Sequence, residues 1–406
     1  MTYRRAAAAA AAALTALSLG LAACATVSSS PPARPKVLPP TGGPSACSTR
    51  VASAPRLGQV STALVTVAGE PFGVVTAARG RWAFVSAPGG QSGGSVAVYQ
   101  TGPAVPRLVR AIPLPAATLP LGEALTPDGR YLLVASQSGA VVISVARADT
   151  GRPNAVIGRL TSPNGLEAIE VAVSPDGRYA FVSLESSFKI AVFRLHQALT
   201  RGFGPSDFAG LIPTGEAPVG LAFSPSGRWL YSTSELAVPA VGGQGTLSVI
   251  SVPRAETDPA RSVVTTVHAG CSPVRVITSA DGAVVWVTAR ESDALLAFSA
   301  ARLLSDPARA RLADVQVGEA PVGLVLVDGG RRLVATDSDR FSLPGGQANL
   351  AVVSVAAALA HRPAVLGYIK SGLFPRQMAL EPGGRTLLVT DFASDQLEAV
   401  SMAGLP

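Results

Sequence analysis

The sequence predicts an all-β protein: a seven-bladed β-propeller of four-stranded antiparallel blades, with the last blade closed by the N-terminal strand. A tight turn with a glycine recurs seven times, and successive turn glycines lie 48 to 55 residues apart. Short runs rich in Val, Ala, Leu and Ile flank each turn, which is typical of a β-hairpin. Two further apolar runs accompany each hairpin, so the repeating unit has four strands. The turn glycines are Gly80, Gly129, Gly177, Gly227, Gly282, Gly330 and Gly384.

The turn itself explains why the chain reverses at these places. In "SPDGRYAFVS" (Ser174–Ser183), Pro175 presets the second position of a type I turn, and Gly177 takes the last position, where a positive φ is often needed. The same pattern is seen in "TPDGRYLLVAS" (Thr126–Ser136) and "SPSGRWLYSTS" (Ser224–Ser234). The repeat is therefore a hairpin signal with a physical cause.

The remaining repeats carry variants of the same pattern. Repeat one, "VTVAGEPFGVVTAARGRWAFVSA", lacks the Pro and Asp of the turn but keeps its Gly. Repeats five, six and seven read "SADGAVVWVTA", "VQVGEAPVGLVLVDGGRRLVATDS" and "EPGGRTLLVTDFASDQLEAVSM". Strands that are apolar on both faces must be covered on both faces, and small sheets stacked around an axis achieve this. An open solenoid would need polar terminal caps, which the sequence lacks.

The two ends of the repeat region predict how the ring closes. Repeat seven has three strands, and "TALVTV" (Thr62–Val67) precedes repeat one without a blade of its own. We expect this segment to pair beside Gln396–Met402. That pairing would remove the exposed sheet edges that otherwise promote aggregation.

The repeats also resemble a known family. "TGEAPVGLAFSPSGRWLYST" (Thr214–Thr233) and its relatives are similar to the YVTN repeats of lactonase-like seven-bladed β-propellers, and the resemblance covers about Thr62–Met402. It implies the propeller fold. It leaves the function open, because that family includes gluconolactonase-type enzymes, surface-layer proteins and proteins without a known activity.

The N-terminal residues predict export and attachment to a membrane. Arg4 and Arg5 precede an uncharged Ala- and Leu-rich run, Ala6–Leu21, as in a secretory signal peptide. The run is too short and Ala-rich for a comfortable membrane span. "LAAC", which ends at Cys24, resembles the lipobox of bacterial lipoproteins, and this implies that Cys24 is acylated. The alternative is an ordinary secreted protein.

These features predict three regions. Residues 1–23 are expected to be a lipoprotein signal peptide, residues 24–61 a disordered Pro-, Ser- and Ala-rich tether, and residues 62–406 the propeller. The expected location is the cell membrane, lipid-anchored on the extracytoplasmic side, either periplasmic or at the cell surface. The envelope type, which the sequence does not reveal, decides which membrane carries the anchor.

The charge distribution gives no reason to expect nucleic-acid binding. The formal net charge is +7, but after Arg56 the chain has 27 basic against 26 acidic residues. A nucleic-acid-binding domain needs a basic patch on a folded face. The basic surplus lies in the signal peptide and the tether, where it favours an anionic lipid surface.

Cysteine and histidine usage gives no metal or cofactor site. The three histidines, His196, His268 and His361, have no partner at metal-ligand spacing, so we expect no metal and no cofactor. The sequence also lacks a G-x-S-x-G nucleophile motif. Cys47 and Cys271 would share an oxidising compartment, but sequence alone does not give their separation, so a disulfide stays open.

Aligning the inner strands places a candidate binding site at the mouth of the central channel. The position that is Gly73, Gly122, Gly220 and Gly323 in four repeats becomes Glu170, Arg275 and Gln377 in the other three. Glu123 and Arg376 lie one residue away in register.

Two interpretations of these polar groups remain, because buried polar groups must pair with each other, with water or with a ligand. One is a structural Glu170–Arg275 bridge or a water plug. The other is a pocket for a small polar or sugar-like ligand, in which Arg275 meets an anionic or carbonyl oxygen and Glu170 meets hydroxyls.

The functional prediction is a membrane-anchored binding or scaffold module, for a small polar ligand or for a surface protein, in a monomeric chain. The alternative is a lactonase-like hydrolase of a sugar lactone. That alternative rests on the resemblance alone, because no residue set in this sequence matches that family's catalytic residues.

Overall fold

The computed structural model describes residues 37–47, 51–77, 82–89, 93–102, 105–152, 154–341 and 348–406. The chain divides into two units, Met1–Arg34 and Pro35–Pro406, and every described residue belongs to the second. The expected signal peptide, Cys24 and the first turn glycine, Gly80, lie outside the described residues. Over the described ranges, no helix is both long and apolar enough to cross a membrane.

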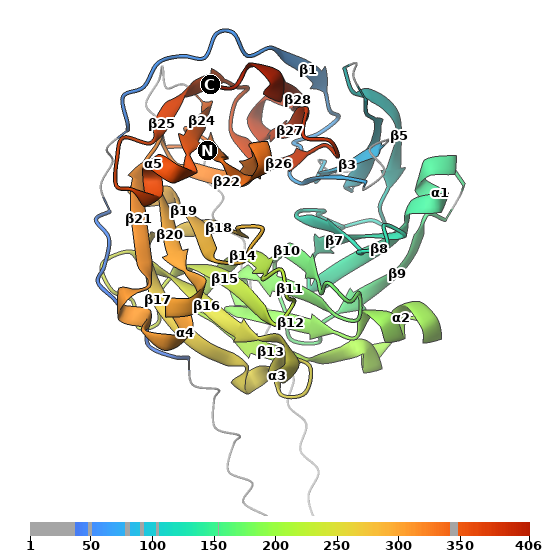
Figure 1. Ribbon diagram of the computed structural model, residues 1–406. Helices are drawn as coiled ribbons and strands as arrows, with labels where there is room; N and C mark the ends of the chain where they lie inside the picture. The colour runs from blue at the N-terminus through green and yellow to red at the C-terminus, as the bar shows by residue number, and fades with distance from the viewer. Residues whose placement is uncertain are drawn as a thin grey trace, which may run out of the picture. The chain divides into compact units, whose positions relative to one another are not determined.

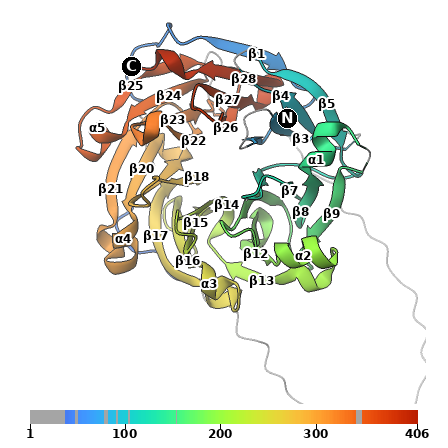
Figure 2. The ribbon, with the colours of Figure 1, turned by 45° about the vertical axis from the view of Figure 1, so that its right-hand side comes forward.

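Residues 62–406 form seven four-stranded antiparallel sheets arranged in a ring, which confirms the predicted seven-bladed propeller (Figure 1; Figure 2). From the axis outward, the strands of blades 1 to 4 are β2 (Val74–Thr76), β3 (Trp82–Ala87), β4 (Ser95–Gln100), β5 (Arg107–Pro113); β6 (Glu123–Leu125), β7 (Tyr131–Ser136), β8 (Gly139–Ser144), β9 (Val156–Thr161); β10 (Ala168–Val173), β11 (Ala180–Leu184), β12 (Lys189–Phe193), β13 (Phe208–Pro213); and β14 (Glu216–Phe223), β15 (Trp229–Leu236), β16 (Gln244–Ser251), β17 (Val263–Cys271). Those of blades 5 to 7 are β18 (Pro273–Thr278), β19 (Val284–Ala289), β20 (Ala294–Ser299), β21 (Arg311–Gln316); β22 (Pro321–Val327), β23 (Arg332–Asp337), β24 (Asn349–Ser354), β25 (Val365–Lys370); and β26 (Pro375–Leu380), β27 (Thr386–Asp391), β28 (Gln396–Ser401), β1 (Thr62–Thr66).

The ring closes as the sequence predicts. Strand β1 pairs antiparallel with β28, with Thr62 opposite Val400 and Thr66 opposite Gln396. The first strand after the N-terminal region thus supplies the outer strand of the last blade. As a result, the three C-terminal strands have no unpaired outer edge.

The turn chemistry is also confirmed in the described repeats. Gly129 and Gly177 have φ of +68° and +71°, the left-handed region that glycine reaches without strain. In repeat two, the Thr126 hydroxyl donates to Asp128 Oδ1 at 2.6 Å, and this oxygen accepts the Arg130 backbone N–H at 3.0 Å. The Ser/Thr and Asp of the motif therefore stabilise the turn by hydrogen bonds of their own.

Adjacent blades are joined near the axis by hydroxyl groups on the second strands. Ser183 donates to Val219 O of the next blade at 2.9 Å, and Thr390 of blade 7 donates to Phe72 O of blade 1 at 2.9 Å. Ser86, Thr233, Thr288 and Thr336 bridge in the same way. Blade 2 has Ala135 at this position, and there the Gly122 N–H donates directly to Ile169 O at 2.8 Å. The hydrogen bond that links blade 7 to blade 1 is therefore of the same kind as those between most other neighbouring blades.

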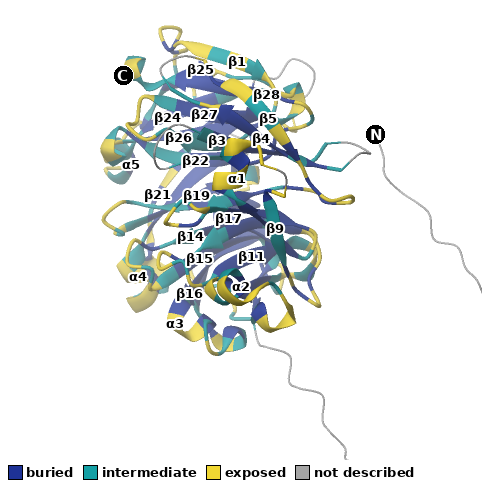
Figure 3. Ribbon diagram, turned by 90° about the vertical axis from the view of Figure 1, so that its right-hand side faces the viewer, coloured by how far each residue is buried: buried dark blue, intermediate teal, exposed yellow. Residues whose placement is uncertain are grey.

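The core consists of the apolar faces between blades. The inner three strands of each blade are largely buried, whereas exposed residues concentrate in loops and in the short helices (Figure 3). Trp286, Phe84, Phe181 and Phe193 are among the largest fully buried side chains. Apolar residues dominate these strands because both faces of each blade pack against a neighbouring blade.

Short helices connect the third and outer strands of five blades, a feature that the repeat pattern did not predict. They are α1 (Val145–Thr150), α2 (Leu195–Arg201), α3 (Val252–Ala255), α4 (Ala300–Ser305) and α5 (Val355–Leu359). Single turns of 3-10 helix are η1 (Glu185–Ser187), η2 (Pro205–Asp207), η3 (Pro259–Arg261), η4 (Arg290–Ser292), η5 (Pro307–Arg309), η6 (Asp328–Gly330), η7 (Phe392–Ser394) and η8 (Met402–Gly404). Of these, η1, η4 and η7 follow second strands and lie next to the candidate site.

The part of the expected tether that the structure describes is attached to the propeller, which corrects the prediction of disorder up to residue 61. Thr41 pairs with Val267 of β17, and Arg56 pairs with Tyr368 of β25. The segment then reaches β1, and in Figure 1 it runs as the blue trace past β17, β21 and β25. Outer strands present unpaired N–H and C=O groups, and the segment pairs with some of them. We call residues 37–60 the strap.

A disulfide joins the strap to blade 4. Cys47 is bonded to Cys271 at the end of β17, and their Cα atoms lie 5.5 Å apart. Next to it, Ser45 N donates to Gln244 Oε1 at 3.0 Å, and Gln244 Nε2 donates to Ser45 O at 2.7 Å. The question that the sequence left open is thus answered by a covalent link. Proline-rich composition favours an extended chain, and here the extended chain has sheet edges to pair with.

Candidate functional site at the channel mouth

The seven aligned positions occupy equivalent places at the start of the inner strands. In six blades, the backbone N–H at this position donates to the hydroxyl that stands 13 residues later on the second strand. Glu170 donates to Ser183 at 3.1 Å, Arg275 to Thr288 at 2.8 Å and Gln377 to Thr390 at 3.1 Å. The alignment made from sequence therefore matches the register of the structure.

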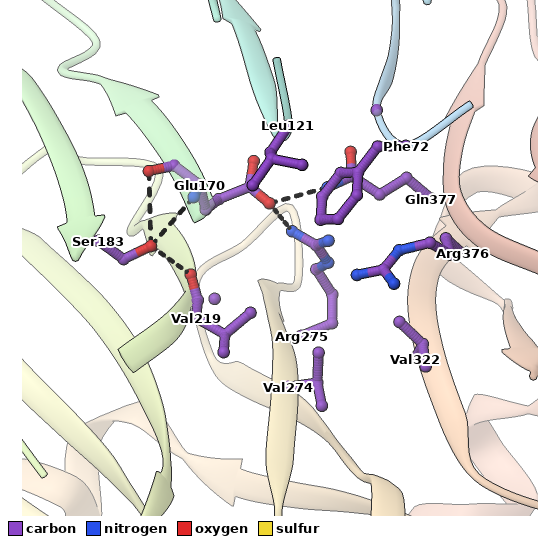
Figure 4. Close-up of polar contacts among 12 residues, drawn as sticks. Phe72, Leu121, Glu170, Ser183, Val219, Val274, Arg275, Val322, Arg376 and Gln377 are labelled. Carbon is purple, nitrogen blue, oxygen red and sulfur yellow. Dashed lines mark hydrogen bonds and ion pairs between the residues drawn. The ribbon is translucent and has the colours of Figure 1, made fainter. Parts of the chain in front are cut away.

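Three of the five predicted site residues contact one another, although they come from three blades. The Arg275 guanidinium forms an ion pair with Glu170 Oε2, and Gln377 Nε2 donates to the same oxygen at 2.9 Å (Figure 4). Glu170 is 5% exposed and Gln377 is 7% exposed. Glu170 is thus a buried carboxylate with two side-chain partners, as a buried charge requires.

Small residues in the intervening blades make room for these long side chains. A Cβ atom on Gly122 would lie 2.6 Å from Glu170 Oε1 and 2.7 Å from Ile169 O. A Cβ atom on Gly323 would lie 2.1 Å from Arg376 O. Glycine is therefore needed because the next inner strand approaches too closely for any side chain.

Glu123 fills the space where two glycine blades are adjacent. Its Cγ would lie 3.1 Å from a Cβ atom on Gly73, and the residue is only 4% exposed. Burial raises the pKa of the Glu123 carboxyl well above its usual range, and the charge of Glu170 raises it further. The backbone N–H groups of Ser86 and Val75 lower it by less. These two N–H groups lie near the carboxyl without meeting hydrogen-bond geometry, so neither carboxyl oxygen has a well-formed hydrogen bond within the described part of the chain.

Arg376 does not join Glu170 but stacks on aromatic rings. Its Cζ lies 3.9 Å from the ring centroid of Phe72, 5.0 Å from that of Phe374 and 5.3 Å from that of Phe392. Burial lowers the pKa of Arg376 to about 9, and repulsion from Arg340, Arg275 and Arg290 adds to the effect. Figure 4 shows its guanidinium below the Phe72 ring, facing the guanidinium of Arg275.

The alignment missed several residues of this face. Phe72 and Phe374 precede the inner strands β2 and β26, and Phe392 opens η7. Arg340 follows β23, and Arg290 pairs with Glu235 at 2.9 Å. Of these residues, Arg340 had a signal in the sequence, the length of the loop after the second strand β23. Parts of two such loops, residues 90–92 and 342–347, lie outside the described residues.

The site contains acids and bases but no obvious metal-binding set. Within the ranges that the structure describes, no three His, Cys, Asp or Glu side chains gather so as to hold a metal ion. The arrangement instead suits hydrogen bonding, because Arg275 still has donors and Glu123 has a carboxyl without partners. The absence of a cofactor stays a prediction.

Comparison with known proteins supports the fold and leaves the function open. The chain is similar to the solved structure of Kuenenia stuttgartiensis hydrazine synthase, with a TM-score of 0.65 and 16% sequence identity over 84% of this chain and 97% of that one. At this identity, the similarity shows the fold alone. No protein-family model and no curated protein matches the chain.

Proposed function

We propose that this protein is an extracytoplasmic binding module that is held at a membrane by lipid on Cys24 and takes a small polar ligand at the channel mouth. The observation that carries the proposal is the Glu123 carboxyl, which is buried near the charge of Glu170 without a well-formed hydrogen bond among the described residues. An unpaired buried polar group costs about 1–3 kcal/mol. A ligand hydroxyl that donates to Glu123 would offset this cost.

The arrangement favours sugar-like ligands over simple apolar ones. Glu170 Oε2 already accepts from Arg275 and Gln377, so its second oxygen and the Glu123 carboxyl are the acceptors that remain. Arg275 uses one of its five side-chain N–H groups in the ion pair. A ligand with both hydroxyls and a carbonyl or anionic oxygen would match these donors and acceptors.

The strap gives the proposed anchor a limited reach. Thr41 is paired with β17, and Cys24 precedes it by 17 positions in the chain. Fully extended, such a segment spans roughly 60 Å. The propeller would therefore stay close to the membrane surface and would be tethered from the side of blade 4. We expect Cys24→Ser to abolish incorporation of labelled fatty acid, and label in that variant would refute the anchor.

The binding proposal is tested with the full chain carrying Cys24→Ser, screened by thermal shift and calorimetry against mono- and disaccharides and sugar lactones. We expect a ligand whose affinity falls about tenfold or more in Glu123→Met, which removes both carboxyl oxygens, since one hydrogen bond to a charged or polar partner contributes about 1–3 kcal/mol. Arg228→Ala is the matched control, because this residue lies over Trp229 next to a hairpin turn. Equal loss in both variants would place the site elsewhere.

The same screen decides between binding and hydrolysis. A sugar lactone that is consumed by the wild type and spared by Glu123→Met would favour the lactonase-like alternative. Binding without consumption favours a binding module.

A further inference from the structure

Arginine and phenylalanine side chains alternate across the face that surrounds the channel mouth. Arg376 lies over Phe72, Phe374 and Phe392. Arg340 lies 5.2 Å from the Phe374 centroid and 5.4 Å from that of Phe341, and Arg290 lies 5.8 Å from the Phe341 centroid. The series crosses from blade 7 through blade 6 to blade 5. Stacking holds each guanidinium by its face and leaves its N–H edge free to meet an anion.

Two of these guanidinium groups lack an acidic partner. Arg290 is paired with Glu235, and Arg275 is paired with Glu170. By contrast, the side chains of Arg340 and Arg376 make no hydrogen bond and no ion pair to any residue that the structure describes, and Arg376 Nε is buried without a partner. The buried Nε–H of Arg376 is costly to leave unpaired, whereas the exposed Arg340 keeps its donors available to a ligand from solvent.

The charges around Arg340 and Arg376 also favour a bound anion. Burial lowers the pKa of Arg340, and the charge of Arg290 lowers it further, while Glu235, Glu185 and Glu291 act in the opposite direction. Burial and then the charges of Arg340, Arg275 and Arg290 lower the pKa of Arg376, and the charge of Glu185 opposes them by less. The cations therefore repel one another where they converge. A bound anion would relieve this repulsion.

From this geometry we infer that the ligand carries at least two oxyanion groups, carboxylate or phosphate, which Arg340 and Arg376 bind through their N–H edges. Both guanidinium groups lie over the Phe374 ring, at 5.2 Å and 5.0 Å from its centroid, so their Cζ atoms are at most about 10 Å apart. Arginine binds planar carboxylates and phosphates in a bidentate manner. This inference rests on the proposed function and names the ligand class at the same mouth.

The test measures binding of digalacturonate, pyrophosphate and cellobiose by calorimetry, on the full chain with Cys24→Ser at fixed ionic strength. Digalacturonate and cellobiose are both disaccharides, but only the first has carboxylates. We expect digalacturonate or pyrophosphate to bind at least tenfold more tightly than cellobiose. Preference between the two anions separates a carboxylate from a phosphate ligand.

The variants assign this binding to residues. Arg340→Gln, at an exposed position, should weaken binding of the preferred anion about tenfold to a hundredfold. The affinity of Arg340→Lys should lie between those of the wild type and Arg340→Gln, because lysine keeps the positive charge but lacks the forked N–H donors of arginine. Arg331→Gln, an exposed arginine of the same blade that pairs with Asp328, is the control and should bind like the wild type.

The outcomes separate this inference from the proposed function. If cellobiose binds as tightly as either anion, or if Arg340→Gln matches Arg331→Gln, the oxyanion site is refuted while a Glu123-dependent ligand can still stand. If no probe binds, the oxyanion site is refuted, and the wider sugar screen alone decides the proposed function.

Discussion

Removal of the Cys47–Cys271 disulfide tests whether the strap belongs to the folded body. Cys47 is exposed and Cys271 is fully buried. Cys47→Ser therefore breaks the bridge without placing a new hydroxyl in the core. The bridge links residues with a sequence separation of 224. In the chain-entropy treatment, a loop of this length contributes about 5 kcal/mol at 25 °C, and measured values are commonly about 2–4 kcal/mol. We therefore expect a loss of about 2–5 kcal/mol.

This loss converts into a shift of the melting temperature. Unfolding entropy is about 2.1 cal/mol/K per residue, or about 0.8 kcal/mol/K for the unit that spans residues 35–406. Cys47→Ser should thus lower the melting temperature by about 3–6 °C in scanning calorimetry. A reductant should lower the wild type to the same value and leave the variant unchanged. Ala46→Ser is the control, since it adds a serine at an exposed neighbouring position.

Two results would refute the reasoning. One is a melting temperature of Cys47→Ser within about 1 °C of Ala46→Ser. The other is a reductant effect of equal size on both variants, because this would show that the shift does not come from the bridge. Amide exchange adds a local readout: the Ser45 N–H, which donates to Gln244, should exchange faster in Cys47→Ser.

Three further predictions concern the ring and its buried acids. Thr390→Val should cost about 1–3 kcal/mol in denaturant unfolding, because Phe72 O and the Gln377 N–H lose the hydroxyl that closes the ring; an unchanged midpoint would contradict this. Gly122→Ala should destabilise by about 1–3 kcal/mol through its clash with Glu170 and Ile169, whereas Gly204→Ala, with no atom within 4 Å of the added Cβ, should not; equal effects would refute the packing argument. Stability should fall as pH rises from about 5 to 8.5. Burial raises the pKa of Asp391 to about 8 and that of Glu398 to about 7, so over this range the folded state holds protons that the unfolded state has released. Asp391→Asn should flatten the dependence of unfolding free energy on pH, and an unchanged slope would count against this explanation.

Asp391 and Glu398 share one hydroxyl partner, and this geometry favours a protonated carboxyl in the folded state. The Ser371 hydroxyl lies 3.1 Å from Asp391 Oδ1 and 2.6 Å from Glu398 Oε2. A hydroxyl has one proton to donate. The second contact is favourable when the other carboxyl is protonated and donates to Ser371.

The sequence predicted the ring, its closure and the alignment of the inner strands, because each depends on a local pattern repeated seven times. Thr62–Thr66 was identifiable as the closing strand because it was the one unassigned apolar segment next to an incomplete last repeat. The Glu170–Arg275–Gln377 cluster was predictable for the same reason: equivalent positions in a ring point toward one axis.

Features that depend on contacts between distant segments were not predictable. The strap reads as a disordered tether because its composition is proline-rich, and only its pairing with β17 and β25 reveals order. The alignment placed Arg376 at the channel mouth, one residue from the polar position, but did not predict its stacking on Phe374, two residues earlier, and on Phe392 of η7. The short helices were missed because four to seven residues with few caps give little periodic signal.

A crystal structure of the full chain with the tightest ligand from the screen tests the central claim, binding at the channel mouth, most directly. The account predicts ligand density within hydrogen-bond distance, about 3.2 Å, of Glu123 or Arg275, with its acidic groups toward Arg340 and Arg376. Density confined to another part of the surface, such as the groove lined by Arg110 and Arg147, would contradict it.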